Sequence, residues 1–240
     1  MKALILAAGR GERMRPLTDT CPKPLLRVHG KPLIEWHIEA LSRAGVNEIV
    51  INTAWLEDRI AGALGDGSRF GVRIAWSMEG RDHGGALETA GGIAKALPLL
   101  AEGAGDGDKP FWLVSADIFA PDFAFDPAAA ARFEATSDSA HLWLVPNPDF
   151  HAKGDFGLDP NGRGLADPAG PDGRTWTYAN LALMRPTLVR HIASGTRAAL
   201  GPLLYAGMRQ GRIGAEVFNG EWHNLGTPAQ LDALNRSTAL

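Results

Sequence analysis

The stretch over residues 6–32 constrains the fold of this chain more than any other segment. An apolar run over residues 3–8 has the length and character of a buried strand, and it ends abruptly at a Gly-Arg-Gly sequence. Glycines directly after such a strand let backbone N–H groups approach an anion closely, because no β-carbon stands in the way. The nearby cations Arg13 and Lys23 favour a polyphosphate as the ligand at this strand end.

Two familiar phosphate-binding loops do not fit these residues. A dinucleotide-binding loop requires a further glycine three residues after Gly11 and a helix that begins at the loop. Met14 occupies the position of that glycine, and Pro16, Pro22 and Pro24 oppose a helix there. A Walker loop requires Gly-Lys followed by Ser or Thr, which the chain does not contain. The loop therefore belongs to another class of phosphate site.

The rest of the chain alternates strand and helix patterns. In the first half, strands are expected at 3–7, 48–52, 72–76 and 111–115, and helices at 32–44, 56–64 and 88–97. In the second half, strands are expected at 140–145, 176–184 and 213–218, and helices at 200–210 and 228–237. The segment 146–174, rich in Gly, Pro and Asp, predicts a hairpin and loop. This alternation predicts an α/β fold of the Rossmann-like class, with a mixed, mostly parallel sheet flanked by helices.

Composition narrows the class of function. The formal net charge of the 240-residue chain is −3, which is too small to favour nucleic acid or an anionic membrane as a partner. Cys21 is the only cysteine, so an intrachain disulfide is excluded. No apolar run reaches the length of a membrane span or of a signal-peptide core. We therefore expect a cytoplasmic protein with no nucleic-acid or membrane partner.

A set of short motifs fills residues 6–32. They are Leu6-Ala7-Ala8-Gly9, Gly11, Arg13, Pro16-Leu17-Thr18, Pro22-Lys23-Pro24-Leu25 and Gly30-Lys31-Pro32. The set resembles the signature L-A-A-G-x-G-[ST]-R-x-x-P-L-T, P-K-P-L and G-K-P of the nucleotidyltransferases that make nucleoside-diphosphate sugars. Glu12 stands where most of that family has Ser or Thr. In this respect the chain is similar to the N-acetylmuramate-1-phosphate uridylyltransferase branch.

The resemblance implies a reaction and the residues that perform it. An oxygen of a sugar 1-phosphate would attack the α-phosphorus of a nucleoside triphosphate (NTP), and pyrophosphate would leave. Arg13 would hold the leaving phosphates, and Lys23 would stabilise the attacking and transferring phosphates. With Asp117, these are the implied catalytic residues. The implied nucleotide-binding residues are Ala8, Gly9, Gly11, Glu12, Arg13, Lys23 and Glu88.

Two positions are candidate ligands for Mg²⁺, the cofactor that the resemblance implies. Asp117 follows the predicted strand 111–115, and ligands bind at such strand ends in open α/β sheets. A helix N-cap is the alternative role for this aspartate. The family's W-x-D-x-G-T-P segment reads W-H-N-L-G-T-P over residues 222–228, so the second ligand would be Asn224. An amide oxygen brings no charge, which predicts weaker metal binding than a carboxylate gives.

Base and sugar recognition are expected elsewhere in the chain. The base site is expected within residues 79–92, where Glu88 replaces the family's usual glycine, again as in the uridylyltransferase branch. Asn147 and Asp155 resemble sugar-contacting positions of that branch, and their side chains suit hydroxyl and amide groups. Each of the two also suits a turn.

These observations predict one nucleotidyltransferase domain over residues 1–240. Its nucleotide-binding half would span 1–120 and its sugar-phosphate-binding half 121–240. The predicted activity transfers a nucleoside monophosphate from UTP to N-acetylmuramate 1-phosphate, a step of peptidoglycan recycling. One alternative is a mannose-1-phosphate guanylyltransferase or a related hexose- or choline-phosphate enzyme. Another is a non-catalytic nucleotide-sugar-binding module, which Ala116 and Asn224 motivate because the family has Gly and Asp there.

Overall fold

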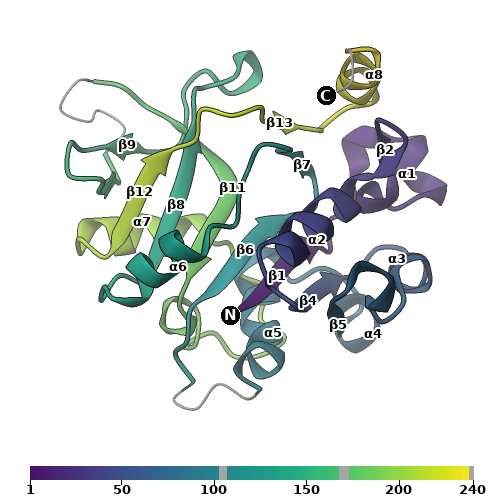
Figure 1. Cartoon of the computed structure of the whole chain (residues 1–240), viewed down its shortest axis with the longest axis horizontal. Coiled ribbons are helices and arrows are strands. Elements are labelled where there is room, and N and C mark those ends of the chain that lie inside the picture. The colour runs from purple at the N-terminus through teal and green to yellow at the C-terminus, as the bar shows by residue number, and fades with distance from the viewer. Residues whose placement is uncertain (103–106, 168–172, 238–240) are drawn as a thin grey trace.

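A seven-stranded sheet forms the centre of the computed structural model, which describes residues 1–102, 107–167 and 173–237 (Figure 1). The strand order is β12-β8-β11-β6-β1-β4-β5. The strands are β1 (Lys2–Ala7), β4 (Glu48–Thr53), β5 (Arg73–Met78), β6 (Phe111–Ser115), β8 (Ala140–Val145), β11 (Thr177–Met184) and β12 (Ile213–Val217). Their sequences are short apolar runs, as expected for strands covered on both faces.

The sheet is mixed and mostly parallel, as the sequence predicted. Strands β6, β1, β4 and β5 run parallel to one another, and β8 pairs in parallel with β12. Strand β11 is antiparallel to both of its neighbours, β6 and β8. The strands from the two halves of the chain therefore form one continuous sheet, joined at β11.

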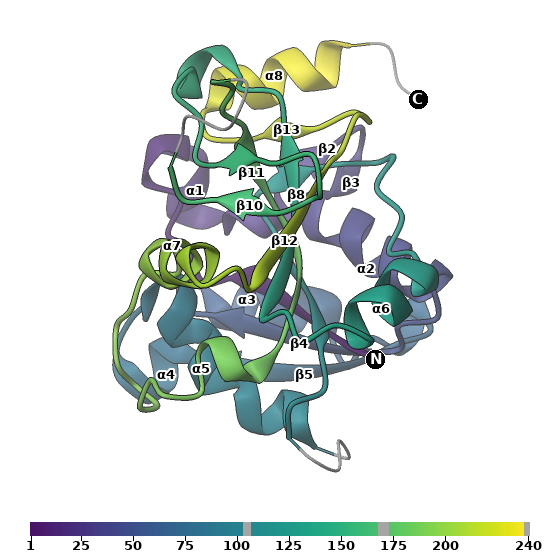
Figure 2. The ribbon, with the colours of Figure 1, turned by 90° about the vertical axis from the view of Figure 1, so that its left-hand side faces the viewer.

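Helices cover both faces of this sheet. Helices α2 (Leu33–Arg43), α3 (Glu57–Leu64) and α6 (Pro127–Glu134) contribute to one buried apolar cluster. Helices α5 (Glu88–Ala101) and α7 (Gly201–Arg209) contribute to the cluster on the other face. Figure 2 shows α6 and α7 on opposite sides of the sheet. This two-sided burial is typical of doubly wound α/β folds.

A third apolar cluster joins the two ends of the chain. Leu231 and Leu234 of α8 (Pro228–Arg236) pack with Met14, Leu26 and other residues that follow β1. Helix α8 begins with a capping box: Gln230 N donates to Thr227 Oγ1 at 3.3 Å, and Thr227 N donates to the Gln230 side chain at 3.0 Å. Just before it, β13 (His223–Asn224) pairs antiparallel with β7 (Ile118–Phe119).

Most predicted elements are confirmed, with ends that differ by a few residues. The 146–174 segment contains the expected hairpin, formed by β9 (Gly157–Leu158) and β10 (Gly164–Leu165), although its residues 168–172 lie outside the described ones. The proline-rich loop forms only single turns, of which α1 (Leu17–Thr20) is the longest. Helices α4 (Glu79–His83) and α6 were not predicted. Within the described residues, no helix is long and apolar enough to cross a membrane.

Candidate active site

The loop after β1 folds back tightly on itself. Gly11 has a φ of 67°, in the left-handed region, and its carbonyl accepts a hydrogen bond from Thr18 Oγ1 at 2.8 Å. A β-carbon at Gly11 would lie 3.0 Å from Thr18 Cγ2 and 3.3 Å from Lys23 Cβ. Gly11 is therefore required both by the backbone conformation and by the close approach of the chain. Gly9 has no atom within 4 Å of its β-carbon position, which leaves that side of the loop open to a ligand.

A cleft of about 590 Å³ lies over the carboxyl ends of the central strands β1, β4 and β6. In open α/β sheets, ligands bind at this edge. All the residues predicted to bind nucleotide line the cleft, together with Asp117: Ala8, Gly9, Gly11, Glu12, Arg13, Lys23 and Glu88. The fold thus brings these predicted positions together in one cavity.

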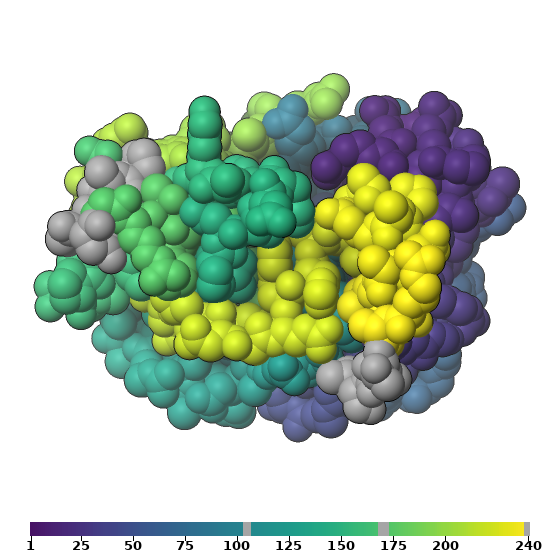
Figure 3. Space-filling view, turned by 90° about the horizontal axis from the view of Figure 1, so that it is seen from above, coloured from purple at the N-terminus to yellow at the C-terminus, as the bar shows by residue number. Residues whose placement is uncertain are grey.

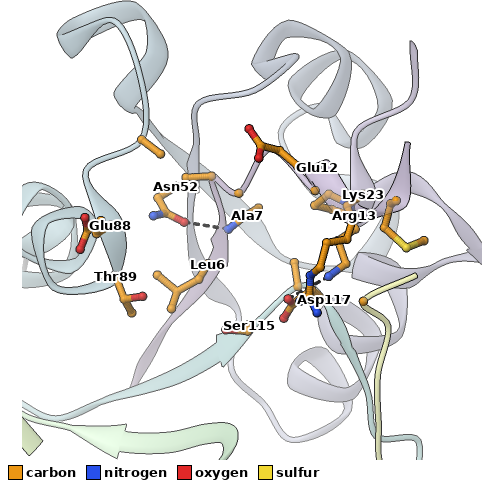
Figure 4. A pocket seen from close by; sticks show the side chains of 18 residues that line it. Leu6, Ala7, Glu12, Arg13, Lys23, Asn52, Glu88, Thr89, Ser115 and Asp117 are labelled. Carbon is orange, nitrogen blue, oxygen red and sulfur yellow. Dashed lines mark hydrogen bonds and ion pairs between the residues drawn. The ribbon is translucent and has the colours of Figure 1, made fainter. Parts of the chain in front are cut away.

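Three charged side chains meet at one end of this cleft (Figure 4). Lys23 Nζ lies 2.9 Å from Asp117 Oδ2, although the two residues are 94 positions apart. The lysine side chain is largely buried, while that of Asp117 is 40% exposed. A β-carbon on Gly226 would lie 3.2 Å from Arg13 Nη1, so the guanidinium lies between the loop that follows β1 and the C-terminal segment. The arrangement places two cations and one carboxylate where a polyphosphate can reach them.

Asn224 lies beside Asp117 because of the short β7–β13 pair. Asn224 is directly opposite Ile118, and Leu225 N donates to the Asp117 carbonyl at 3.1 Å. The Asn224 Oδ1 atom is buried and has no hydrogen-bond partner in the structure. A buried, unsatisfied amide oxygen fits a hard divalent cation, which takes oxygen ligands. In the described ranges, no cluster of three or more His, Cys, Asp or Glu residues could hold a metal.

Glu88 and Thr89 lie at the opposite end of the cleft (Figure 4). Glu88 has a φ of 59°, a left-handed conformation in which glycine is unstrained. This conformation gives a physical reason for the glycine that the family usually has here. The Glu88 carboxylate is half exposed, and its Oε1 lies 3.8 Å from Arg197 Nη2.

A buried hydrogen-bond chain supports this end, and the sequence analysis missed it. Asn52 Oδ1 accepts from Ala7 N at 2.8 Å, and Asn52 Nδ2 donates to Glu79 Oε1 at 2.6 Å. Glu79 Oε2 accepts from Leu87 N at 2.7 Å. Glu79 is fully buried, and this burial raises the pKa of its carboxyl group, against the opposing effect of the hydrogen bonds. These hydrogen bonds link the end of β1 to Leu87, the residue before Glu88. The only sign of them in the sequence was a polar Asn near the end of a buried strand.

A second cleft, of about 540 Å³, continues from the first. The two share Leu6, Arg13, Thr89 and Ser115 as lining residues. Asp155 lines this second cleft: its Oδ1 lies 2.9 Å from His151 Nε2, and its Oδ2 accepts from Tyr178 N at 2.8 Å. Asn224 also lines it. A ligand in the second cleft would therefore lie next to a nucleotide in the first.

Asn147 lies outside both of these clefts. Its amide nitrogen donates to Thr175 Oγ1 at 2.8 Å, and its amide oxygen accepts from Thr177 Oγ1 at 2.9 Å. It lines a third cleft, of about 640 Å³, between α8 and the segment that follows β8, where Figure 3 shows a hollow in the surface. Both ends of the amide are thus satisfied by the protein. The side chain holds the segment 147–155 in place rather than facing the cleft that Asp155 lines.

Comparison with known proteins decides the family. Residues 2–158 match the family model described as nucleotidyl transferase. The chain belongs to this family. The chain is 48% identical over 236 residues to the N-acetylmuramate alpha-1-phosphate uridylyltransferase of Neisseria meningitidis serogroup B. The aligned region covers 96% of this chain and 95% of that protein. The resemblance noted in residues 6–32 is therefore confirmed, and the protein is a nucleotidyltransferase.

Other known proteins are similar over shorter lengths or at lower identity. The catalytic subunit beta of the mannose-1-phosphate guanylyltransferase of Xenopus tropicalis is 38% identical over 127 residues, which is 52% of this chain and 33% of that protein. A solved Bacillus anthracis structure, assigned as a glucose-1-phosphate thymidylyltransferase, superposes with a TM-score of 0.76 at 22% identity and covers 100% of this chain and 97% of that one. At that identity the superposition supports the fold alone.

Proposed function

We propose that this protein transfers UMP from UTP to N-acetylmuramate 1-phosphate. The observation that carries the proposal is the joined pair of clefts, with Arg13, Lys23 and Asp117 at the end of one and Asp155 in the other. The near full-length likeness to a uridylyltransferase for that sugar phosphate supports the choice of both substrates. We further propose that residues 1–240 form one domain and that the reaction belongs to cytoplasmic peptidoglycan recycling.

The proposed chemistry is an in-line displacement at phosphorus. A phosphate oxygen of the sugar 1-phosphate forms a bond to the α-phosphorus of UTP, and the bond from that phosphorus to the bridging oxygen of the β-phosphate breaks. Pyrophosphate leaves with the electron pair of the broken bond. In such displacements catalysis consists mainly of positioning and of neutralising charge.

The side chains at the cleft supply these two effects. We assign Arg13 to the β- and γ-phosphates and Lys23 to the α-phosphate and the attacking sugar phosphate. Lys23 lies between two prolines in a single turn, which restricts its backbone, and its largely buried side chain is held by the ion pair with Asp117, so its ammonium group is positioned before a ligand binds. Backbone groups of residues 8–11 would surround the remaining phosphate oxygens, since Gly9 leaves open space beside the loop.

Enzymes of this family use a divalent metal, and we propose Mg²⁺ for this one. Asp117 and Asn224 would hold it through a carboxylate and an amide oxygen. When bound, the ion would neutralise the negative charge of the phosphates. The buried, unpartnered Asn224 Oδ1 is the observation in support. We assign the uracil to the end of the cleft near Glu88, and the sugar to the cleft that Asp155 lines.

Release of pyrophosphate tests the proposal directly. The purified protein is incubated with Mg²⁺, one of UTP, GTP, CTP or dTTP, and one of four 1-phosphates: N-acetylmuramate, N-acetylglucosamine, glucose or mannose. We expect release with UTP and N-acetylmuramate 1-phosphate above every other pair. If pyrophosphate were released mainly from GTP and mannose 1-phosphate, the proposed substrates would be wrong, whereas the proposed mechanism would still hold. No release from any pair, with UTP still bound, would favour a non-catalytic binding module.

A further inference from the structure

The turn η4 (Asp149–His151) presents two rings at the edge of the second cleft. Phe150 is 56% exposed, the most exposed of the three large apolar side chains that stand out from the described surface. It lines both the second and the third cleft, so its ring lies where the two meet. In Figure 3 the segment after β8 is a raised part of the surface beside the hollow. An aromatic ring exposed at the mouth of a binding cleft is suited to contact an apolar part of a ligand.

The neighbouring His151 is held in a fixed orientation. Its Nε2 is hydrogen-bonded to Asp155 Oδ1, and Asp155 is itself fixed by hydrogen bonds from Tyr178 N and from the Tyr205 hydroxyl to its backbone carbonyl at 3.0 Å. Within the described part of the chain, no residue is hydrogen-bonded to His151 Nδ1. The side chain is 40% exposed. One ring nitrogen is therefore occupied by the protein, and the other is available to a ligand.

The charges along the second cleft are unevenly placed. Apart from two tyrosines, its ionisable lining residues among those described are Arg13, His151 and Asp155. Arg13 lies at the end shared with the nucleotide cleft, where phosphates are expected. His151 is thus a basic group of this cleft that the nucleotide cleft does not share, and it is the neighbour in sequence of an exposed apolar ring. A sugar phosphate that carries a second acid group, together with a methyl group, would match this part of the cleft.

We propose that Phe150 and His151 recognise the lactyl ether that distinguishes N-acetylmuramate from N-acetylglucosamine. The carboxylate of the ether would accept a hydrogen bond from His151 Nδ1, and its methyl group would lie on the ring of Phe150. Asp155 is then a positioning residue, because both of its carboxylate oxygens already have protein partners. This inference rests on the proposed function, since it assumes that sugar 1-phosphates occupy the second cleft.

Binding and turnover of two sugars test the inference. The dissociation constants of N-acetylmuramate 1-phosphate and N-acetylglucosamine 1-phosphate are measured in the presence of a non-hydrolysable UTP analogue, and kcat/KM is measured for both with UTP. The variants are His151→Gln, which can still donate to Asp155, and Phe150→Ala. His141→Gln is the matched control, because His141 Nε2 also faces a carboxylate, Glu216 Oε2 at 3.5 Å, but lines neither cleft.

We expect the preference for N-acetylmuramate 1-phosphate to fall by about tenfold or more in His151→Gln, the loss of one charge-assisted hydrogen bond. It should fall by about fourfold in Phe150→Ala, the loss of one methyl contact. The control should keep the wild-type preference. Equal losses for both sugars, or no loss for either, would overturn the inference. A wild-type protein that binds neither sugar 1-phosphate would instead refute the proposed function.

Discussion

The tight packing around the Asn52–Glu79 hydrogen bond makes Gly92 the most informative position for a stability test. Gly92 lies in α5, where alanine is normally the better residue. A β-carbon at this position would lie 2.6 Å from Asn52 Nδ2 and 2.6 Å from Glu79 Oε1. Neither atom can move freely, because both belong to the buried series of hydrogen bonds that links Ala7 to Leu87. The substitution Gly92→Ala should therefore disrupt the hydrogen bond between Asn52 and Glu79.

The expected magnitude follows from three terms. The change from glycine to alanine inside a helix stabilises the folded state by about 1 kcal/mol. Overpacking of a buried site costs about 1–3 kcal/mol. The loss of a hydrogen bond to a charged group costs about 1.5–3 kcal/mol. Gly92→Ala should therefore lower the free energy of unfolding by about 1.5–5 kcal/mol, because the two costs together exceed the gain in helix propensity.

Urea denaturation followed by circular dichroism measures this difference, and α3 supplies a matched control. Gly62 is an exposed helical glycine with no atom within 4 Å of its β-carbon position. Gly62→Ala should therefore raise the free energy of unfolding by about 0.5–1 kcal/mol. The two substitutions are chemically identical and should have opposite signs. A Gly92→Ala protein as stable as the wild type would refute the reasoning, because Asn52 and Glu79 would then have moved at no cost.

Three further predictions concern charge at and near the site. Lys23→Ala should lower kcat by about 10²–10³-fold while the circular dichroism spectrum stays native, and near-normal turnover would contradict its assigned role. Asn224→Asp should lower the Mg²⁺ concentration that gives half-maximal pyrophosphate release, because a carboxylate adds charge to the site; an unchanged titration would place the second ligand elsewhere. Burial lowers the pKa of His37 to about 4, so between about pH 6.5 and 4 the unfolded chain binds a proton that the folded chain does not. Stability should fall by about 3 kcal/mol as the pH drops through that window, and His37→Gln should lose this part of the pH dependence in urea denaturation; equal pH slopes would refute it.

The grouping of Gly11, Arg13 and Lys23 at one cleft could be predicted because these residues are close in the sequence. Gly11, Arg13 and Lys23 lie within one short motif, so their proximity needs no knowledge of the fold. Asp117 could be placed near them because it follows a buried strand, and the carboxyl ends of parallel strands share one edge. The strand and helix patterns were equally local, which explains why most of the sheet was predicted.

The rest of the site depends on pairings that leave no local pattern. Asn52 and Glu79 are ordinary polar residues in the sequence, and only their burial against Gly92 identifies them. Asn147 and Asp155 both suited a sugar, but the hydrogen bonds that separate their roles involve residues about 20 to 30 positions further along the chain. The antiparallel direction of β11 is likewise a property of its pairing with β6 and β8, which its own sequence does not reveal.

The two-residue pair between β7 and β13 has a consequence for how the protein is made. A ribosome synthesises Arg13, Lys23 and Asp117 long before Asn224. Until β13 docks on β7, and α8 packs against Met14 and Leu26, the nascent chain has the loop that follows β1 but not the C-terminal segment that packs against it. A short strand pair holds little stability by itself, so this docking depends on the apolar contacts of α8. The onset of activity would therefore follow the emergence of that helix from the ribosome rather than completion of the central sheet.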